Sequence, residues 1–219
     1  MGSEFKVYKD YYLKDKIKYT RITTPLDYFQ APELVDWKLD TDNHKEVSKT
    51  AKQIGTRVHN LIKMDYEKGK YSLTPNDSVS IVNCMKAYEE WKKVEQPKIM
   101  VMEKTMFNDE LRIAGTMDIQ TVGKIVDIKT STSIKPNYWL QLAMYNYLNN
   151  TLYDLAILRL DKFSSDYQFI TIPYDKRLVN IYLCLLSYYR YIVSNPEDSD
   201  KLDLEDTIEV NPFDSLLIQ

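Results

Sequence analysis

The sequence predicts a mixed α/β domain in which a central mixed sheet of about five strands is flanked by helices. Apolar residues first recur at helical spacing, then alternate along runs rich in β-branched residues, and two further helical patterns enclose a second pair of such runs. The chain has 219 residues, 44% of them hydrophobic, which is enough for one sizeable core. It contains only five glycines and eight prolines and has no long linker tract, which favours a single domain.

The first half of the chain is predicted to be helical. A short helix with an extended lead-in is expected in TRITTPLDYFQAPELVDWKL, residues 20–39, after its Thr-Pro signal. A longer helix should run from about His44 to Lys68 and end at the glycine of EKGK. A third is expected within TPNDSVSIVNCMKAYEEWKKVEQP, with an N-cap near Asn76 or Asp77 and a stop at Pro97.

The second half is predicted to form the sheet. Strands are expected at 98–107, 111–120 and 124–130, with turn signals NDE and VGK between them. A helix at 136–150, strands at 153–162 and 167–174, and a final helix should follow. Residues 6–195 are therefore assigned to one domain, made of a helical part (20–97), a sheet core (98–175) and a C-terminal helix (175–195). The opening MGSEF (1–5) is assigned to an expression scar and 196–219 to a solvated acidic tail.

Charge, cysteines and hydropathy exclude several classes of protein. The net charge of −3 does not suit a protein that coats nucleic acid through bulk charge, so a nucleic-acid enzyme would need a local basic groove. Cys84 and Cys184 are read as reduced core thiols rather than a disulfide, and two cysteines cannot supply a four-cysteine iron–sulfur or zinc site. No apolar run approaches the roughly 20 residues of a membrane span, and no signal peptide is recognisable. A cytoplasm-like compartment is expected.

The stretch IAGTMDIQTVGKIVDIKTS, residues 113–131, carries the chemistry. With a two-residue turn at Val122-Gly123, Asp118 would lie directly opposite Asp127, their Cβ atoms about 4.5–5.5 Å apart. Side chains alternate along a strand, so Asp127 and Lys129 share a face. The other face, with Met117, Ile119, Val126 and Ile128, is expected to be the core face.

Two opposed carboxylates require a shared proton or a cation between them. A hard divalent ion such as Mg²⁺ accepts carboxylate oxygens, and a neighbouring lysine could stabilise developing negative charge. This is the arrangement used to hydrolyse a phosphodiester. A solvated strand face with a surface salt bridge is the alternative interpretation of the hairpin alone.

Four motifs together resemble the PD-(D/E)XK nuclease superfamily, in its RecB-type branch without an iron–sulfur cluster. GTMD (115–118) is similar to the family's G-x-x-D strand, and DIKT (127–130) to its D-x-K-T strand. Upstream, IGTRVHNLI is similar to the helical G-T-x-x-H motif; downstream, QLAMYNYL is similar to the Q-L-x-x-Y helix. The resemblance spans about residues 20–148. The phage λ exonuclease branch has E-x-K where this chain has DIK, and it ranks second.

The resemblance implies a restriction-endonuclease-like core and a set of metal ligands. Asp118 and Asp127 would bind Mg²⁺ or Mn²⁺ together with the backbone carbonyl of Ile128. His59 would reach the metal from the long helix, and Lys129 would lie near the attacking water. No iron–sulfur cluster is expected.

Further residues are assigned to the site with alternatives left open. Gln141 and Tyr145 share a helical face and would contact Lys129 or the DNA backbone, or else face the core. Glu103 has a water-mediated metal role or is an exposed strand carboxylate. Four residues are candidates for DNA contacts, by donating to phosphate or by stacking on bases, although helical aromatics more often belong to a core: Thr130, Ser131, Tyr138 and Trp139.

The expected function is a metal-dependent DNA exonuclease that hydrolyses phosphodiester bonds at single-stranded, frayed or double-stranded ends, in recombination, repair or replication. The abundance of Tyr, Lys and Asn suggests a phage or mobile-element gene and, in that case, the host cytoplasm. A structure- or sequence-specific endonuclease is one alternative, and a nuclease-like DNA-binding module that does not cut is another. A single-strand-binding or annealing protein is a candidate partner, and no membrane partner is expected.

Overall fold

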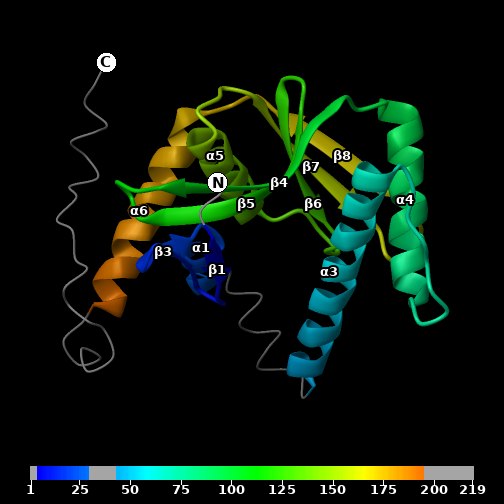
Figure 1. The fold of residues 1–219 in the computed structure, drawn as a ribbon, viewed down its shortest axis with the longest axis horizontal. Coiled ribbons are helices and arrows are strands. Elements are labelled where there is room, and N and C mark those ends of the chain that lie inside the picture. The colour runs from blue at the N-terminus through cyan, green and yellow to red at the C-terminus, as the bar shows by residue number, and fades with distance from the viewer. Residues whose placement is uncertain (1–3, 30–42, 195–219) are drawn as a thin grey trace.

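The computed structural model describes residues 4–29 and 43–194, apart from the side chain of His44. In chain order its elements are β1 (Phe5–Val7), β2 (Tyr11–Lys14), β3 (Ile17–Arg21), α1 (Thr23–Tyr28), α3 (His44–Lys68), α4 (Val79–Glu95), β4 (Ile99–Asn108), β5 (Ile113–Thr121), β6 (Lys124–Lys129), α5 (Pro136–Leu148), β7 (Asp154–Leu160), β8 (Tyr167–Ile172) and α6 (Lys176–Val193) (Figure 1). The rest of the predicted first helix (30–39), the start of the expected scar (1–3) and the acidic tail lie outside the described residues.

The predicted fold class is confirmed: a central mixed sheet is flanked by helices. The sheet has eight strands rather than about five, in the order β1-β2-β3-β5-β6-β7-β8 with β4 paired to β5. The sequence pattern missed β1, β2 and β3, which have 3, 4 and 5 residues. Strands this short contain too few alternations to be recognised from their side chains alone.

The central strand β5 changes its neighbour along one edge. On one side it pairs with antiparallel β4 over nearly its whole length. On the other it pairs with parallel β3 at Ile113 and Ala114, and with antiparallel β6 only from Ile119 to Thr121. Among the described residues no strand therefore covers this edge of β5 between Ala114 and Ile119. The sheet opens there, and the opening contains Asp118.

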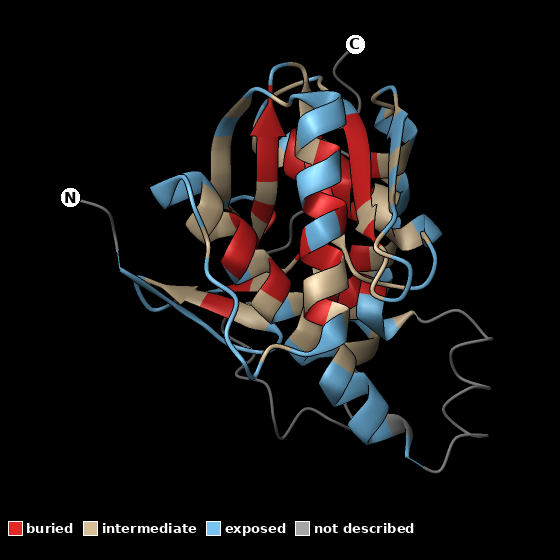
Figure 2. Cartoon of the chain, turned by 90° about the vertical axis from the view of Figure 1, so that its right-hand side faces the viewer, coloured by how far each residue is buried: buried red, intermediate tan, exposed pale blue. Residues whose placement is uncertain are grey.

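Helices cover both faces of the sheet and bury two apolar layers. The helices α5 and α6 pack on one layer, which includes Met117 and Ile125. The helices α3 and α4 pack on the other, which includes Ile119, Val126 and Ile128. Figure 2 views the molecule from the α3–α4 side, with buried residues between the helices and the strands. The strand β6 lies between these layers because its parallel pairing with β7 places it inside the sheet.

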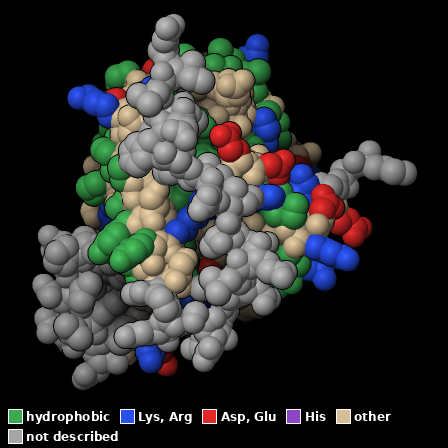
Figure 3. Space-filling model, turned by 90° about the vertical axis from the view of Figure 1, so that its left-hand side faces the viewer, with side chains coloured by type: hydrophobic (Ala, Val, Ile, Leu, Met, Phe, Trp, Pro, Cys, Tyr) green, Lys and Arg blue, Asp and Glu red, His purple; other side chains and the backbone are tan. Residues whose placement is uncertain are grey.

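Aromatic contacts attach the N-terminal segment to α6. The ring of Tyr28 packs against Tyr189, with centroids 5.4 Å apart, and Phe29 stacks on Tyr188 at 5.2 Å. Figure 3 views this side of the molecule, where hydrophobic side chains lie at the surface between charged ones. No helix in the described ranges has the length and hydropathy needed to cross a membrane.

The ends of the long helices follow the predicted signals in part. Gly69, with φ of 68°, ends α3 in the left-handed conformation, as predicted. The predicted N-cap of α4 is wrong: the helix begins after Ser78, and its N-cap position has no side-chain hydrogen bond. Asp77 accepts instead from Arg57 of α3 at 2.7 and 2.8 Å, and from the backbone N–H of Thr74 at 2.7 Å. Its carboxylate ties the loop before α4 to α3.

Candidate metal centre and its lysine

The predicted two-residue turn between β5 and β6 is present. Thr121 pairs with Lys124, and the register continues through Gln120 with Ile125. Gly123 has a φ of 76°, a conformation that residues with a side chain rarely adopt. The turn predicted from VGK is therefore confirmed.

The ladder ends one pair before the two aspartates. Ile119 with Val126 is the last pair between the strands, and Asp118 and Asp127 would be next in this register. Asp118 Oδ2 instead accepts a hydrogen bond from the backbone N–H of Ile128 at 2.8 Å. The carboxylate thus bridges two strands that are separating, and β6 continues alongside β7.

The hairpin was predicted to have one buried face and one face outside the core, and this prediction is wrong. Asp127 is only 1% exposed, and Ile125 on the same face of β6 belongs to the α5–α6 layer. Met117 also lies in that layer, whereas Ile119 lies in the α3–α4 layer. The alternation identified the two faces of β6 correctly, but on β5 it placed Met117 and Ile119 on one face, whereas they lie in different layers. It could not show that helices cover both faces, or that β5 contacts different helices along its length.

Three side chains from three elements meet at the opening in the sheet. His59 of α3 lies with Nδ1 3.5 Å from Asp118 Oδ1 of β5 and 4.0 Å from Glu103 Oε1 of β4. One potential ligand atom from each residue lies within 4.8 Å of the other two. The other ring nitrogen of His59, Nε2, lies 3.2 Å from the backbone carbonyl oxygen of Ile128. A histidine nitrogen and carboxylate and carbonyl oxygens are suitable ligands for a divalent cation.

Glu103 reaches this group through an unusual backbone conformation. Its φ is 55°, in the left-handed region that side chains with a Cβ rarely adopt. The register between Met102 with Ile119 and Lys104 with Met117 places Glu103 across from Asp118, yet the ladder is interrupted at this position. Such strain is usually retained at functional sites. The sequence showed an acidic residue in a strand, but it contained no signal for this local distortion.

The carboxylates of the group are held at a cost in solvation. Burial raises the pKa of Asp118 above its usual value, while the nearby His59 ring opposes this shift and the charge of Asp127 adds to it. Burial likewise raises the pKa of Glu103, and the Asp118 charge raises it further. A bound cation would remove the repulsion between these groups.

Lys129 is fixed beside the group by its own contacts. Its Nζ lies 2.7 Å from Asp127 Oδ2, an oxygen that has no well-aligned hydrogen bond among the described residues. It also donates to Gln141 Oε1 at 3.2 Å, and Gln141 Nε2 donates to the Tyr145 hydroxyl at 2.8 Å. The Tyr138 ring centroid lies 4.5 Å from Nζ. Asp127 therefore lies outside the three-residue group and pairs with the lysine, and Gln141 and Tyr145 face Lys129 from α5.

Gly115 allows α5 to approach the open edge of β5. A Cβ at this position would lie 2.7 Å from Tyr145 Cε1 and 2.8 Å from Ile22 Cδ1. No side chain fits at these distances, so the ring of Tyr145 packs directly on the strand. The glycine of GTMD thereby sets the position of the hydroxyl that supports Gln141.

The candidate DNA contacts fall into two environments. Thr130 and Ser131 follow β6 and are partly exposed, whereas Tyr138 and Trp139 are partly buried against the α5–α6 layer. Arg159, which no sequence pattern marked, donates to the carbonyl oxygens of Ser131 at 3.3 Å and Thr132 at 3.4 Å. Arg159 lies on β7, where it pairs with Lys129 of β6. This pairing joins segments far apart in the chain, so a local sequence pattern cannot reveal it.

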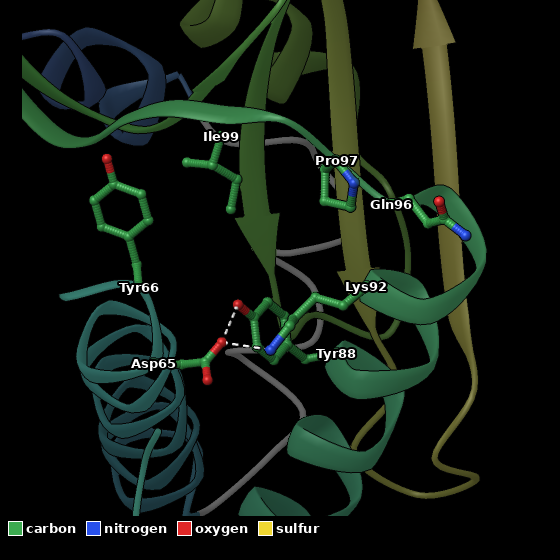
Figure 4. A pocket seen from close by; sticks show the side chains of 7 residues that line it. All are labelled: Asp65, Tyr66, Tyr88, Lys92, Gln96, Pro97 and Ile99. Atoms are coloured by element: carbon green, nitrogen blue, oxygen red, sulfur yellow. Dashed lines mark hydrogen bonds and ion pairs between the residues drawn. The ribbon is translucent and has the colours of Figure 1, made fainter. Parts of the chain in front are cut away.

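A second polar cluster lies between the C-terminal half of α3 and α4 (Figure 4). Asp65 Oδ2 accepts from the Tyr88 hydroxyl at 2.9 Å and from Lys92 Nζ at 2.6 Å. Together with Tyr66, Gln96, Pro97 and Ile99 they line an open cavity of about 280 Å³. The carboxylate already has two donors, so this cluster resembles a structural tie between the helices more than a cation site.

The comparisons with known proteins concern the fold. No family model and no curated protein matches the chain. A solved structure of a candidate exonuclease from Eubacterium rectale has a TM-score of 0.50 and 14% identity, and the match covers 91% of this chain and 93% of that one. An alkaline exonuclease from Laribacter hongkongensis has a TM-score of 0.47 and 8% identity, covering 80% and 88% of the two chains. A phage-related exonuclease from Haemophilus somnus 129PT has a TM-score of 0.42 and 15% identity, covering 80% and 95%.

At these identities the comparisons bear on the fold alone, and the two TM-scores below 0.5 carry no weight. The likeness to the Eubacterium rectale protein extends over nearly the whole of both chains. It agrees with the predicted fold class, a central mixed sheet flanked by helices. The function must be argued from the site.

Proposed function

We propose that this protein is a divalent-metal-dependent deoxyribonuclease that degrades DNA from its ends. One observation carries the proposal: His59, Glu103 and Asp118 converge beside the Lys129–Asp127 pair at the opening in the sheet. Burial, and after it the charge of a neighbouring carboxylate, raises the pKa of both Glu103 and Asp118, and a cation entering the group would offset these costs.

The donor set fits a hard divalent ion. His59, Glu103 and Asp118 offer one nitrogen and two carboxylate oxygens, and the carbonyl oxygen of Ile128 lies 3.2 Å from the other ring nitrogen of His59. Oxygen-rich ligand sets of this kind suit Mg²⁺ or Mn²⁺. Cysteine thiolates are instead the typical ligands of structural zinc and of iron–sulfur clusters. Asp127, which the resemblance implied as a further ligand, pairs with Lys129 and acts on Asp118 through its charge.

A bound divalent ion supplies a nucleophilic water at neutral pH and neutralises charge on the phosphate oxygens. The residues of the chain would position the phosphodiester. Lys129, held by Asp127 and Gln141, presents an ammonium that can donate to a phosphate oxygen as negative charge develops there. The hydroxyls of Thr130 and Ser131 are further donors next to it in the chain.

The direct test is digestion of linear DNA labelled at the 5′ or the 3′ end, single- and double-stranded, with Mg²⁺ or Mn²⁺ and with EDTA. Asp118→Asn and Lys129→Gln should lose at least about 10²–10³-fold in rate. Asp77→Asn is a matched control, since it removes a carboxylate that contacts α3 away from the site. Digestion by Asp118→Asn at the wild-type rate would contradict the mechanism.

Circular DNA separates the exonuclease from the alternatives. Covalently closed duplex and circular single strands should remain intact while linear DNA of the same sequence is degraded. Cleavage of the circles would favour a structure- or sequence-specific endonuclease on the same fold. Tight binding to DNA without cleavage in any divalent metal would favour a non-cutting binding module.

The biological setting is also part of the proposal. End degradation would serve recombination, repair or replication, and a single-strand-binding or annealing protein would act on the strand that remains. Co-purification with such a protein, compared between wild type and Asp118→Asn, would test this partner without depending on cleavage.

A further inference from the structure

The helix α3 carries a row of lysines that leads to the candidate metal centre. Lys45, Lys49 and Lys52 are exposed and follow one another at spacings of four and three residues. At 3.6 residues per turn these positions, and His59 further along, lie within about 40° of one line along the helix. The three lysines, named the lysine row below, thus point to the same side of α3 as the histidine of the site.

The part of α3 that bears the lysine row extends beyond the sheet (Figure 1). Residues 45–50 of the helix are exposed, and the first fully buried residue of α3 is Val58. The packing of the core therefore does not account for this half of the helix. Figure 2 draws this part of α3 mainly in pale blue, the colour of exposed residues.

The lysine row is unfavourable for the helix itself. Cations in the first turns oppose the helix dipole, and like charges at spacings of three and four residues repel each other. In the described part of the chain none of the three ammonium groups forms an ion pair, in contrast to Lys63, which lies 3.9 Å from Glu67. An external anion would relieve this repulsion.

Lys52, the member of the row closest to His59 along the helix, acts on the same carboxyl group as Lys129. Burial raises the pKa of Asp27 on α1, and Lys129 and Lys52 oppose this shift. Asn137 of α5 donates to the carbonyl oxygen of Leu26 at 3.1 Å, which attaches α1 beside the helix that supports Lys129. Lys52 and Lys129 therefore act on one carboxyl group from two elements, in a protein whose net charge is −3.

We propose that the lysine row binds the phosphate backbone of the DNA strand that enters or leaves the candidate metal centre. This inference rests on the proposed function and adds the path of the substrate. From His59 to Lys45 the helix rises about 21 Å at 1.5 Å per residue. That length corresponds to roughly six nucleotides of a strand at 3.4 Å each. The row would contact phosphates and would not read sequence.

The test compares two triple variants with matched changes in charge. One replaces the lysine row (Lys45→Gln, Lys49→Gln, Lys52→Gln), and the other replaces three exposed lysines on or after α4 (Lys86→Gln, Lys93→Gln, Lys98→Gln). Binding of a 20-nucleotide strand is measured between 50 and 200 mM salt, with Ca²⁺ in place of Mg²⁺ to suppress cleavage. Thermal melts establish that both variants are folded.

Loss of three phosphate contacts should lower the slope of log affinity against log salt by about 2–3. The advantage of wild type over the row variant should then shrink roughly 20-fold between 50 and 200 mM salt, at the slope of about 0.7 per phosphate contact of a single strand. The α4 variant should keep the wild-type slope. The effect of the row should fall to about one contact on strands of three or four nucleotides, which reach Lys52 but are too short to reach Lys49 and Lys45.

An unchanged salt slope in the row variant, or an equal change in the α4 variant, would overturn the inference. An effect of the same size on the shortest strands would also overturn it, because the row would then act on the site rather than along a strand. If wild type binds with the expected slope but no metal supports cleavage, the lysine row stands and the proposed nuclease function fails. If cleavage occurs and the slopes are equal, only the row fails.

Discussion

The carboxylates of Asp77 and Asp118 contact side chains of α3 that are two residues apart, but only that of Asp77 is balanced by a cation hydrogen-bonded to it. Asp77 meets Arg57, and Asp118 lies beside His59; their side chains are 6% and 13% exposed. Asp77 receives two guanidinium hydrogen bonds and one from the backbone of Thr74, which hold its pKa well below the usual value. Burial and a neighbouring carboxylate raise the pKa of Asp118.

The two carboxylates differ in how deeply they lie in the fold and in the partners that balance their charge. Asp77 is in a surface loop and is matched by a cation of the same chain. Asp118 is at the centre of the sheet, where desolvation is severe and the nearest charges include Glu103 and Asp127. A carboxylate that is satisfied within the chain stabilises the fold, whereas one that is not satisfied is available to a cation from outside. Four predictions test this distinction.

The largest effect is expected on catalysis. Asp118→Asn should reduce DNA cleavage by at least about 10²–10³-fold, because the proposed metal loses a charged ligand. Asp77→Asn should leave the cleavage rate per folded molecule unchanged. The measurement is initial rates with both variants, normalised by the folded fraction from circular dichroism. Equal losses in both variants would mean that the two carboxylates do not differ in role.

The next effect is the response of stability to a divalent ion. At about 100 times its dissociation constant, a ligand of the folded state adds about 2.7 kcal/mol, which corresponds to a rise in Tm of about 5–10 °C for a chain of this size. We expect this rise with Mn²⁺ in wild type and in Asp77→Asn, and none in Asp118→Asn. Calorimetry with and without EDTA measures it. A rise of the same size in Asp118→Asn would place the ion elsewhere.

The third effect is the loss of stability on removing the satisfied carboxylate. Asp77→Asn should lower the free energy of unfolding by about 1–3 kcal/mol, because Arg57 loses its charged acceptor. A group whose pKa is lowered by folding stabilises above its unfolded pKa of about 3.9 and loses that contribution as the pH falls through the folded value. The difference between wild type and variant should therefore be constant at neutral pH and shrink below about pH 4.

Denaturant unfolding at pH 7, 5, 4 and 3 would measure this difference. A difference that stays constant down to pH 3 would contradict the assignment of the stabilisation to the ionised Asp77.

The smallest effect should have the opposite sign. Without metal, Asp118→Asn removes one of several close negative charges while keeping an oxygen that can accept from the Ile128 N–H. The variant should be more stable than wild type by roughly 0.5–2 kcal/mol, as is common when a functional group is replaced. Urea unfolding in EDTA is the measurement. A clear loss of stability would show that the Asp118 carboxylate stabilises the sheet without a bound cation, which contradicts its assignment as an unsatisfied group.

The sequence located most of the site along the chain because several signals are local. The glycine of VGK specified the turn that sets the β5–β6 register, and two-residue alternation put Asp127 and Lys129 on one face of β6. Helical spacing likewise put Gln141 and Tyr145 on one face of α5, where they now line up behind Lys129.

The parts that were missed depend on contacts between distant segments. Glu103 received no firm role because its left-handed backbone and its position across from Asp118 arise from an interrupted ladder. Arg159 was not recognised because it meets Ser131 and Thr132 only through the pairing of β7 with β6. The strands β1 to β3 were too short to give a pattern, and the acidic tail lies outside the described residues.

By itself the sequence determined the kinds of elements and their order from α1 onward, and the charged residues on β4, β5 and β6. These follow from side-chain periodicity and turn chemistry, which act over a few residues. The tertiary structure decided that helices cover both faces of β6, that the sheet opens at Asp118, and that His59 and Glu103 reach the same opening. Those outcomes depend on how the helices pack and on where β5 exchanges β6 for β3, and no pattern within a single segment contains that information.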